Sequence, residues 1–259
     1  MNNLKVSIIT PSFNSSATIS ETIKSVLSQI YADIEYIIVD GSSKDGSDKI
    51  IHSYGNRISK FISEPDNGIY EAINKGIKLS TGDIVGILNS DDFFFNNSVV
   101  ERIAESFQNN ETESVFGDVQ FVNSVYANKV VRYYSSQNFA PDKFKYGHMP
   151  AHPSFYVRRE FYERFGYYRT DYKIAADYEL LIRFLYIHKI RYKYLNFPFV
   201  CMRTGGVSNK SVFSNFTLNK EIARACAENG IKTNYFYIYS KYFTKIFQFF
   251  GKRITRKLW

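Results

Sequence analysis

Cysteine, tryptophan and proline are scarce in this chain of 259 residues, which has two cysteines, one tryptophan and six prolines. Cys201 and Cys226 are too few for the disulfide framework on which small secreted domains depend, so we expect a protein of the reducing cytosol. The length and a hydrophobic content of 44% suffice for a sizeable core. We therefore expect one large domain, or one domain with a small appendage.

Long hydrophobic runs are also missing. No stretch approaches the roughly 18 uninterrupted apolar residues that indicate a membrane-spanning helix. Residues 1–5 lead directly into a strand-like pattern, without the hydrophobic segment of a signal peptide. These features predict a cytoplasmic protein with no transmembrane helix.

Acidic residues are missing from residues 235–259, which carry six basic ones. Because the whole chain has 33 basic and 25 acidic residues, the excess positive charge is concentrated in this segment and the body is nearly neutral. A nucleic-acid-binding protein would spread its basic residues over the body, so no nucleic-acid partner is expected.

The same C-terminal segment carries apolar residues at helical spacing, at Tyr239, Phe243, Ile246, Phe250 and Ile254. A basic, aromatic-rich amphipathic helix is typical of proteins bound to anionic membrane surfaces. The alternative is a helix packed on the domain with a solvated basic face. We interpret residues 211–259 as a helical extension that associates with the inner face of the cell membrane.

Strand and helix patterns alternate in the first half of the chain. Helical stripes cover residues 18–30, about 45–54, and 69–79, and strand patterns cover residues 6–10, 34–39, 58–62 and 84–88. This alternation predicts an α/β fold with a mostly parallel central sheet flanked by helices.

The second half of the chain is less regular. Residues 115–122 and 129–134 are predicted as antiparallel strands, and residues 135–150 as a long polar and aromatic loop of a length often found in lids. The remaining predicted elements are strands at 152–158 and 191–203 and helices at 178–187 and 211–229.

Polar segments follow four of the predicted strands. Because the carboxyl ends of parallel strands lie at one edge of a sheet, we expect these segments to converge on one crevice. Each has a structural alternative, since Asn14 or Asp66 could cap a helix and Asp40 could form an Asx-turn. The four segments are 10–14, 40–43, 64–70 and 89–92.

Two adjacent carboxylates, Asp91 and Asp92, follow the apolar run at 84–88. The chain has neither a G-x-G-x-x-G nor a G-x-x-x-x-G-K-[ST] pattern, so a glycine-rich helix N-terminus is not expected to hold phosphates. A divalent cation that holds a diphosphate would explain why two carboxylates lie next to each other at this place. We predict Mg²⁺ or Mn²⁺ as the cofactor.

The motifs Thr10-Pro11-Ser12-Phe13-Asn14, Val39-Asp40-Gly41-Ser42, Asn67-Gly68, Thr81-Gly82-Asp83 and Asn89-Ser90-Asp91-Asp92 together resemble the GT-A-fold glycosyltransferases of family 2. The resemblance is ordered across residues 4–100 and continues more loosely to about residue 208. It implies a GT-A (Rossmann-like) domain over residues 1–210. A nucleotide-sugar-binding half would cover about 1–110 and an acceptor half about 111–210.

The resemblance implies that Asp40 contacts the nucleobase, that Asp92 binds the metal and that Asp91 lies near the ribose or the metal. His152 is a further candidate metal contact, with a satisfied structural histidine as the alternative. Arg203 would lie over the diphosphate on an active-site loop, unless the loop at 203–208 is a linker turn. The residues expected to bind the donor are Pro11, Ser12, Asn14, Asp40, Ser42, Asp66, Asn67, Gly68, Asn74, Asn89, Asp91 and Arg203.

The family's catalytic base is an acidic residue near the start of a later helix, often in a Glu-Asp pair. Here Ala176-Asp177 stands at that place, so the resemblance implies Asp177 as the base. Because the glutamate is replaced, Glu179 is a second candidate. Without the resemblance, capping of the helix would explain Asp177.

The resemblance implies an inverting transfer of a sugar from a nucleotide-diphosphate donor, with uracil as the commonest base. The expected acceptor is a saccharide or lipid-linked saccharide in surface-polysaccharide assembly, such as O-antigen or capsule. A non-catalytic nucleotide-sugar-binding or scaffold module stays open, as does a nucleotidyltransferase.

Overall fold

A computed structural model of the chain describes residues 4–109, 111–124, 129–204 and 212–240. These residues form one nine-stranded sheet. Its strands are β1 (Val6–Ser12), β2 (Ile34–Asp40), β3 (Lys60–Ser63), β4 (Ile84–Ile87), β5 (Phe93–Phe94), β6 (Ser114–Val122), β7 (Val130–Tyr134), β8 (Tyr156–Arg158) and β9 (Tyr192–Arg203). Their spatial order is β3-β2-β1-β4-β8-β6-β9-β5, with β7 paired to β6.

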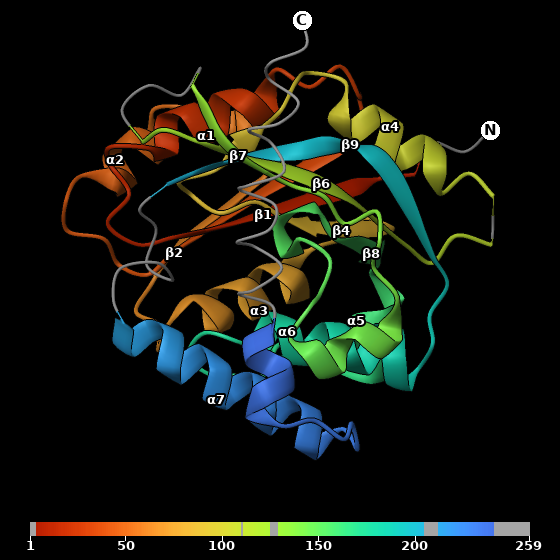
Figure 1. Cartoon of the computed structure of the whole chain (residues 1–259). Helices are drawn as coiled ribbons and strands as arrows, with labels where there is room; N and C mark the ends of the chain where they lie inside the picture. The colour runs from red at the N-terminus through yellow and green to blue at the C-terminus, as the bar shows by residue number, and fades with distance from the viewer. Residues whose placement is uncertain (1–3, 110, 125–128, 205–211, 241–259) are drawn as a thin grey trace, which may run out of the picture.

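Helices cover both faces of this sheet (Figure 1). The α-helices are α1 (Ile19–Leu27), α2 (Ser47–His52), α3 (Ile69–Leu79), α4 (Val99–Ser106), α5 (Glu160–Phe165), α6 (Ala176–Leu181) and α7 (Val212–Glu228). Short 3₁₀ helices are η1 (Gly55–Arg57), η2 (Pro141–Tyr146) and η3 (His152–Ser154), and a π-helical turn, η4 (Ile182–Ile187), continues α6.

Two hydrophobic cores separate the helices into layers. Helices α1, α2 and α4 cover one face, while α3, α5, α6 and α7 cover the other (Figure 1). Neighbouring residues of β1 enter different cores, since Ile8 packs with α1 and Ile9 packs with α3. A strand buried on both faces in this way is nearly continuously apolar, and in residues 6–9 only Ser7 interrupts the apolar side chains.

The first half of the sheet is parallel, as the sequence predicts. Strand β1 pairs in parallel with β2 and with β4, and β2 pairs in parallel with β3. Parallel pairing requires crossover connections, and α1 and α3 supply two of them. The carboxyl ends of these four strands therefore lie at the same edge of the sheet.

The second half of the sheet is mixed. Strand β8 is antiparallel to β4 and to β6, and β6 is parallel to β9. The predicted antiparallel pair at 115–122 and 129–134 is confirmed as β6 and β7. Gly86 allows β8 to lie against β4, because a Cβ there would be 2.0 Å from the ring of Tyr156.

The structure differs locally from the sequence predictions at three points. The loop at 135–150 contains η2, which begins at Pro141 and ends before Gly147 in the left-handed conformation. The predicted strand at 152–158 is extended only over β8, because Pro153 follows the start of η3. Helices α4 and α5 were not predicted.

The C-terminal extension is described as far as residue 240. Helix α7 contributes Ile222, Ala225 and Cys226 to the core, and residues 235–240 are helical, with Ile238 buried. The predicted membrane-associating stripe at 243–254 lies outside the described residues. In the part of the chain that the structure describes, no helix combines the length and apolarity that crossing a membrane requires.

A buried carboxylate at the amino-terminal edge of the sheet joins four segments. Glu35 of β2 accepts hydrogen bonds from Ser7 Oγ (2.6 Å), from Thr81 N–H (2.7 Å) and from Lys60 Nζ (2.8 Å). Burial acts to raise the pKa of Glu35. The Lys60 ammonium and these hydrogen bonds outweigh burial and lower the pKa from 4.5 to about 2.

This shift predicts a pH dependence of stability. Because the carboxylate is stabilised in the folded state, Glu35 contributes fully to the free energy of unfolding above pH 4.5 and loses that contribution as the pH falls toward 2. We expect Glu35→Gln to flatten the pH dependence of urea unfolding midpoints between pH 4.5 and 2. A Glu105→Gln variant on the exposed face of α4 should keep the wild-type dependence.

Candidate active site

The four polar segments follow the strands that end at one edge of the sheet. Strand register places Ser12 opposite Asp40 and Asp40 opposite Ser63. On the other side of β1, Leu88 N–H donates to Ile9 O (2.9 Å), so the chain leaves β4 beside β1 and enters Asn89. The convergence of strand ends predicted from the sequence is therefore present.

Hydrogen bonds fasten the loop after β1 to the loop after β2. Asn14 N–H donates to Ser43 Oγ (2.8 Å), and Lys44 N–H donates to Asn14 Oδ1 (3.0 Å). The Asn14 amide oxygen is thus used between loops and does not cap α1. Asn14 and Ser42 have φ angles of 47° and 60°, a strained conformation for these residue types that is concentrated at functional sites.

Asp40 is fully buried and surrounded by serines. Its Oδ1 accepts hydrogen bonds from Ser12 Oγ (3.1 Å) and Ser43 Oγ (2.5 Å), and its Oδ2 accepts from Ser43 N–H (2.9 Å) and Ser63 Oγ (2.8 Å). The structural alternative of a side chain that braces its own turn is therefore realised here. Contact between Asp40 and a nucleobase stays a prediction, and a ring N–H would have to take the place of one serine hydroxyl.

A close approach at Gly41 brings three strand-end loops into contact. A Cβ at Gly41 would lie 2.7 Å from Asp66 Oδ2 and 3.2 Å from Phe13 Cδ2, so a larger residue would separate them. The Phe13 side chain is 65% exposed, which is unusual for a large aromatic residue. A free ring beside a carboxylate can stack on a flat heterocycle while the carboxylate accepts an N–H. Phe13 was not among the residues predicted to bind the donor.

The segment between β3 and α3 forms a turn held by its own side chains. Asp66 Oδ1 accepts from Gly68 N–H (2.9 Å), and the Asn67 side chain donates to Glu71 Oε2 (2.7 Å). Gly68 has a φ of 127°, which favours glycine, and it precedes the first residue of α3. Asp66 thus shapes the turn and leaves its Oδ2 beside Gly41.

Asp92 is the buried member of the acidic pair, only 2% exposed. Burial raises the pKa of its carboxyl well above the usual range, and the neighbouring Asp91 carboxylate adds to the rise. Asn89 Nδ2, which donates to Asp92 Oδ2 (3.2 Å), and Arg203 act in the opposite direction. The raised pKa shows that these partners do not fully compensate the buried charge.

A divalent cation fits this place chemically, because it would compensate a buried carboxylate that lies beside a second one. Mg²⁺ is commonly held by one or two carboxylates and completed by phosphate oxygens and water, which Asp91 and Asp92 would allow. Among the described residues, no three His, Cys, Asp or Glu side chains are grouped closely enough to hold a metal. A metal site that Asp91, Asp92 and His152 share therefore has no support among the described residues, and their contacts with a metal stay predictions.

His152 is the first residue of η3, and its buried ring contacts Tyr168. Its Nε2 is 2.8 Å from the hydroxyl of Tyr168, and their rings meet edge to face. Burial lowers the pKa of His152, whereas the nearby Asp177 carboxylate acts to raise it. The structural alternative named for this histidine accounts for these contacts.

Arg203, at the end of β9, points toward α1 and the acidic pair. Its Nη2 is ion-paired with Glu21, and its guanidinium lies 5.3 Å from the centre of the Phe93 ring. Its buried Nε has no hydrogen-bond partner among the described residues. Contact with a diphosphate stays a prediction, and residues 205–208 of the expected loop lie outside the described residues.

Asp177 lies in the first turn of α6 and is half-buried. Burial raises the pKa of its carboxyl, and the Glu221 carboxylate adds to the rise, while His152 and the Tyr178 N–H oppose it. The helix begins after Ala175 without a side-chain cap, so Asp177 does not serve as the N-cap. A carboxylate with a raised pKa is a better proton acceptor at neutral pH.

The second candidate base, Glu179, is committed elsewhere. Its carboxylate is almost fully buried and forms a bidentate ion pair with Arg183 (2.8 and 2.9 Å). Arg183 also donates to the carbonyl groups of Gly166 (3.0 Å) and Tyr167 (2.7 Å). Glu179 therefore holds a structural arginine, and the geometry favours Asp177 over it.

Asn74, expected to bind the donor, uses its whole amide within the protein. Its Nδ2 donates to Tyr168 O (2.7 Å), and its Oδ1 accepts from Tyr168 N–H (3.0 Å). This pair of bonds ties α3 to the segment that leads into α6. Only the fold brings these two residues together, because they are far apart in the sequence.

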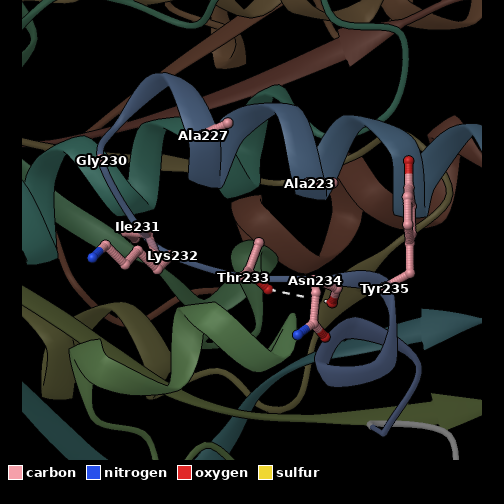
Figure 2. Close-up of a pocket in the computed structure, with 8 residues that line it drawn as sticks. All are labelled: Ala223, Ala227, Gly230, Ile231, Lys232, Thr233, Asn234 and Tyr235. Atoms are coloured by element: carbon pink, nitrogen blue, oxygen red, sulfur yellow. Dashed lines mark hydrogen bonds between the residues drawn. The ribbon is translucent and has the colours of Figure 1, made fainter.

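A pocket of about 610 Å³ lies away from these strand ends (Figure 2). It is formed where the chain turns back from α7, between that helix and the residues that follow it. Its lining contains none of the predicted site residues and consists of Ala223, Ala227, Gly230, Ile231, Lys232, Thr233, Asn234 and Tyr235.

A model of the family described as glycosyl transferase family 2 matches residues 7–169. The chain is 26% identical over 222 residues to a PGL/p-HBAD biosynthesis glycosyltransferase of Mycobacterium bovis, with 81% of each chain covered.

Two solved structures share the fold. S. aureus TarS in complex with UDP-GlcNAc has a TM-score of 0.65 and 18% identity, covering 86% of this chain and 66% of that one. The mannosyltransferase PcManGT from Pyrobaculum calidifontis, in complex with GDP-Man and Mn²⁺, has a TM-score of 0.63 and 17% identity, covering 88% and 64%. The chain spans 39% of a longer TarS chain. The predicted GT-A fold is confirmed.

The buried charge of Asp92 predicts a variant that is more stable without ligands. Because Asp92→Asn keeps the side-chain shape and removes the charge beside Asp91, we expect the free energy of unfolding to rise by about 1 kcal/mol or more. Urea unfolding at neutral pH in EDTA measures it. Asp142→Asn, at an exposed position of η2, should change it little. A loss of stability in Asp92→Asn would contradict this account.

Proposed function

The chain belongs to glycosyl transferase family 2, and from that membership we propose that it moves a sugar from a uridine diphosphate donor to a hydroxyl group of a saccharide or lipid-linked saccharide. The observation that carries this proposal is the acidic pair Asp91-Asp92 at the edge where β1, β2 and β4 end. A uridine donor is supported by the similar fold of TarS, which holds UDP-GlcNAc.

The donor would lie across the carboxyl ends of the parallel strands. The nucleobase would stack on Phe13 above Gly41, with Asp40 or Asp66 accepting its ring N–H. The loops that carry Pro11, Ser12, Asn14 and Ser42 would hold the ribose and approach through their backbone. Asn89 holds the Asp92 carboxylate through a hydrogen bond from its Nδ2.

A divalent cation bound by Asp91 and Asp92 would supply neutralisation of the negative charge that develops on the leaving diphosphate. PcManGT, which shares the fold, holds Mn²⁺. Arg203, whose Nε lacks a partner among the described residues, is the protein's own positive charge beside Asp92 and would also face the diphosphate.

Asp177 would act as the general base. As the acceptor oxygen forms its bond to the anomeric carbon, the bond from that carbon to the diphosphate oxygen breaks, and the hydroxyl proton passes to the Asp177 carboxylate. Such a single displacement inverts the anomeric carbon. The raised pKa of Asp177 suits a base that works near neutral pH, and Glu179 is occupied by Arg183.

Replacement of Asp177 tests this role. Asp177→Asn should lower kcat by roughly 10² to 10⁴-fold, because the positioned base is lost. The affinity for UDP with Mn²⁺, measured by calorimetry, should stay within about twofold, since Asp177 lies in the acceptor half. Donor turnover in the wild-type protein should also stop in EDTA.

Asp142→Asn, at the exposed position on η2, is the control for a carboxylate-to-amide change. Full turnover by Asp177→Asn would remove Asp177 from the mechanism. Metal-dependent donor binding by the wild-type protein, without transfer to any acceptor, would favour a non-catalytic module instead.

We also propose that the C-terminal extension binds an anionic membrane surface, where a lipid-linked acceptor in surface-polysaccharide assembly would lie. Phe236 is 79% exposed, and Phe216, Tyr235 and Tyr239 also present large aromatic side chains to solvent. Aromatic residues at a protein surface, followed by a basic segment, suit the interface of an anionic bilayer.

Vesicle binding tests this role. Phe236→Ser should weaken binding to vesicles rich in phosphatidylglycerol by about 10- to 100-fold, because one buried aromatic side chain is worth about 1.5 to 3 kcal/mol. Phe95→Ser, at an exposed position next to β5, should bind as the wild-type protein does. Equal binding by both variants, or no binding by the wild-type protein, would contradict the membrane role.

A further inference from the structure

The segment that leads into α6 is held by side chains from two other helices. Glu221 of α7 accepts hydrogen bonds from three successive backbone N–H groups, those of Lys173 (2.8 Å, to Oε1), Ile174 (2.9 Å, to Oε2) and Ala175 (2.9 Å, to Oε2). The hydroxyl of Tyr70 in α3 donates to the carbonyl of Ile174. The Ile174 residue is thus fixed at both its N–H and its C=O.

These hydrogen bonds hold the residues that immediately precede the proposed base in the sequence. Ala175 is the N-cap of α6, and Asp177 is two residues further along the chain. Glu221 is only 9% exposed, so its hydrogen bonds are shielded from water and each N–H would lack a partner if the carboxylate were removed. The direction in which α6 leaves the loop, and therefore the place of the Asp177 carboxylate, depends on this contact.

We propose that Glu221 is a positioning residue for glycosyl transfer, which acts by fixing the backbone at 173–175 so that Asp177 is held against the acceptor hydroxyl. The proposal rests on the proposed role of Asp177. Glu221 lies in α7, beyond the residues 7–169 that match the family, so the proposal assigns part of the acceptor half to the C-terminal extension.

The second contact connects the two halves of the site. Tyr70 lies in the first turn of α3, directly after the turn formed by Asp66, Asn67 and Gly68 that is proposed to meet the donor. Its ring stacks on that of Tyr168 at 5.9 Å, and Asn74 of the same helix bonds the backbone of Tyr168. Helix α3 therefore joins the donor turn to the loop that Glu221 holds.

Kinetics of three variants test the proposal. Glu221→Gln keeps the shape and one carbonyl oxygen but loses an acceptor. Glu221→Ala removes the contact, and Tyr70→Phe removes only the hydroxyl. We expect kcat to fall by about 10-fold in Glu221→Gln and about 100-fold in Glu221→Ala, since a displacement of about 1 Å can cost 10²-fold. The donor KM should stay within about twofold, and Tyr70→Phe should behave like Glu221→Gln.

Glu228→Gln is the matched control. Glu228 lies on the same helix and binds the same segment through Arg169 and Tyr172, but these contacts are at the surface and precede residue 173. It should keep the wild-type kcat. Hydrogen exchange at 173–175, measured without substrate, should accelerate in both Glu221 variants and not in Glu228→Gln.

The outcomes separate the two proposals. If the wild-type protein transfers sugar and Glu221→Gln and Tyr70→Phe keep kcat within twofold, the positioning role is wrong and the proposed function stands. The proposal would also be overturned if kcat fell equally in Glu228→Gln, or if the donor KM rose as much as kcat fell. Either result would mean that Glu221 only stabilises the fold. A wild-type protein without transfer would overturn both.

Discussion

The parallel pairing of β1 with β2 on one side and β4 on the other is the constraint on which the candidate site depends. Parallel strands end at the same edge, so the polar residues that follow each strand meet there although they are tens of residues apart. The close approach at Gly41 and the bonds between Asn14 and Ser43 then set the distance between the loops. Polar loops at a sheet edge become a site only through this register.

The buried carboxylates of this chain differ in how well their partners compensate the charge. This difference separates structural carboxylates from candidate functional ones. Glu179 is neutralised by Arg183, and Glu221 is satisfied by three backbone N–H groups. Burial raises the pKa of Asp92 and that of Asp177 beyond what the partners of each carboxylate offset. Uncompensated burial of this kind is expected where a ligand or a proton completes the site.

The alternating first half of the fold was predictable because each strand and helix there has a strong apolar pattern and each connection is short. The polar strand ends and the acidic pair were visible as motifs, whereas Asp177 was named only through the resemblance to the family. The mixed second half was less predictable: α4 and α5 are short, and β8 depends on the contact of Gly86 with Tyr156, which no local pattern reveals.

Residues that act through long-range contacts could not be identified from the sequence either. Glu221 is one of 25 acidic residues in the chain, and Phe13 is one of 23 phenylalanines until its exposure is known. The amide of Asn74 and the ring of His152 both contact Tyr168, which only the folded chain brings to them.

The hydrogen bonds from residues 173–175 to Glu221 of α7 bear on where this chain could be joined to a relative in a chimera. A chimera joined at residue 169 would keep every strand-end loop of the donor half and receive its α6 and α7 from another parent. Because Glu221 and residues 173–175 lie on the same side of such a junction, they would be inherited together, while Tyr70 would stay behind. The fit of the two parents would then depend on the hydrogen bonds that cross the junction, from Tyr70 to the carbonyl of Ile174 and from Arg183 to the carbonyls of Gly166 and Tyr167.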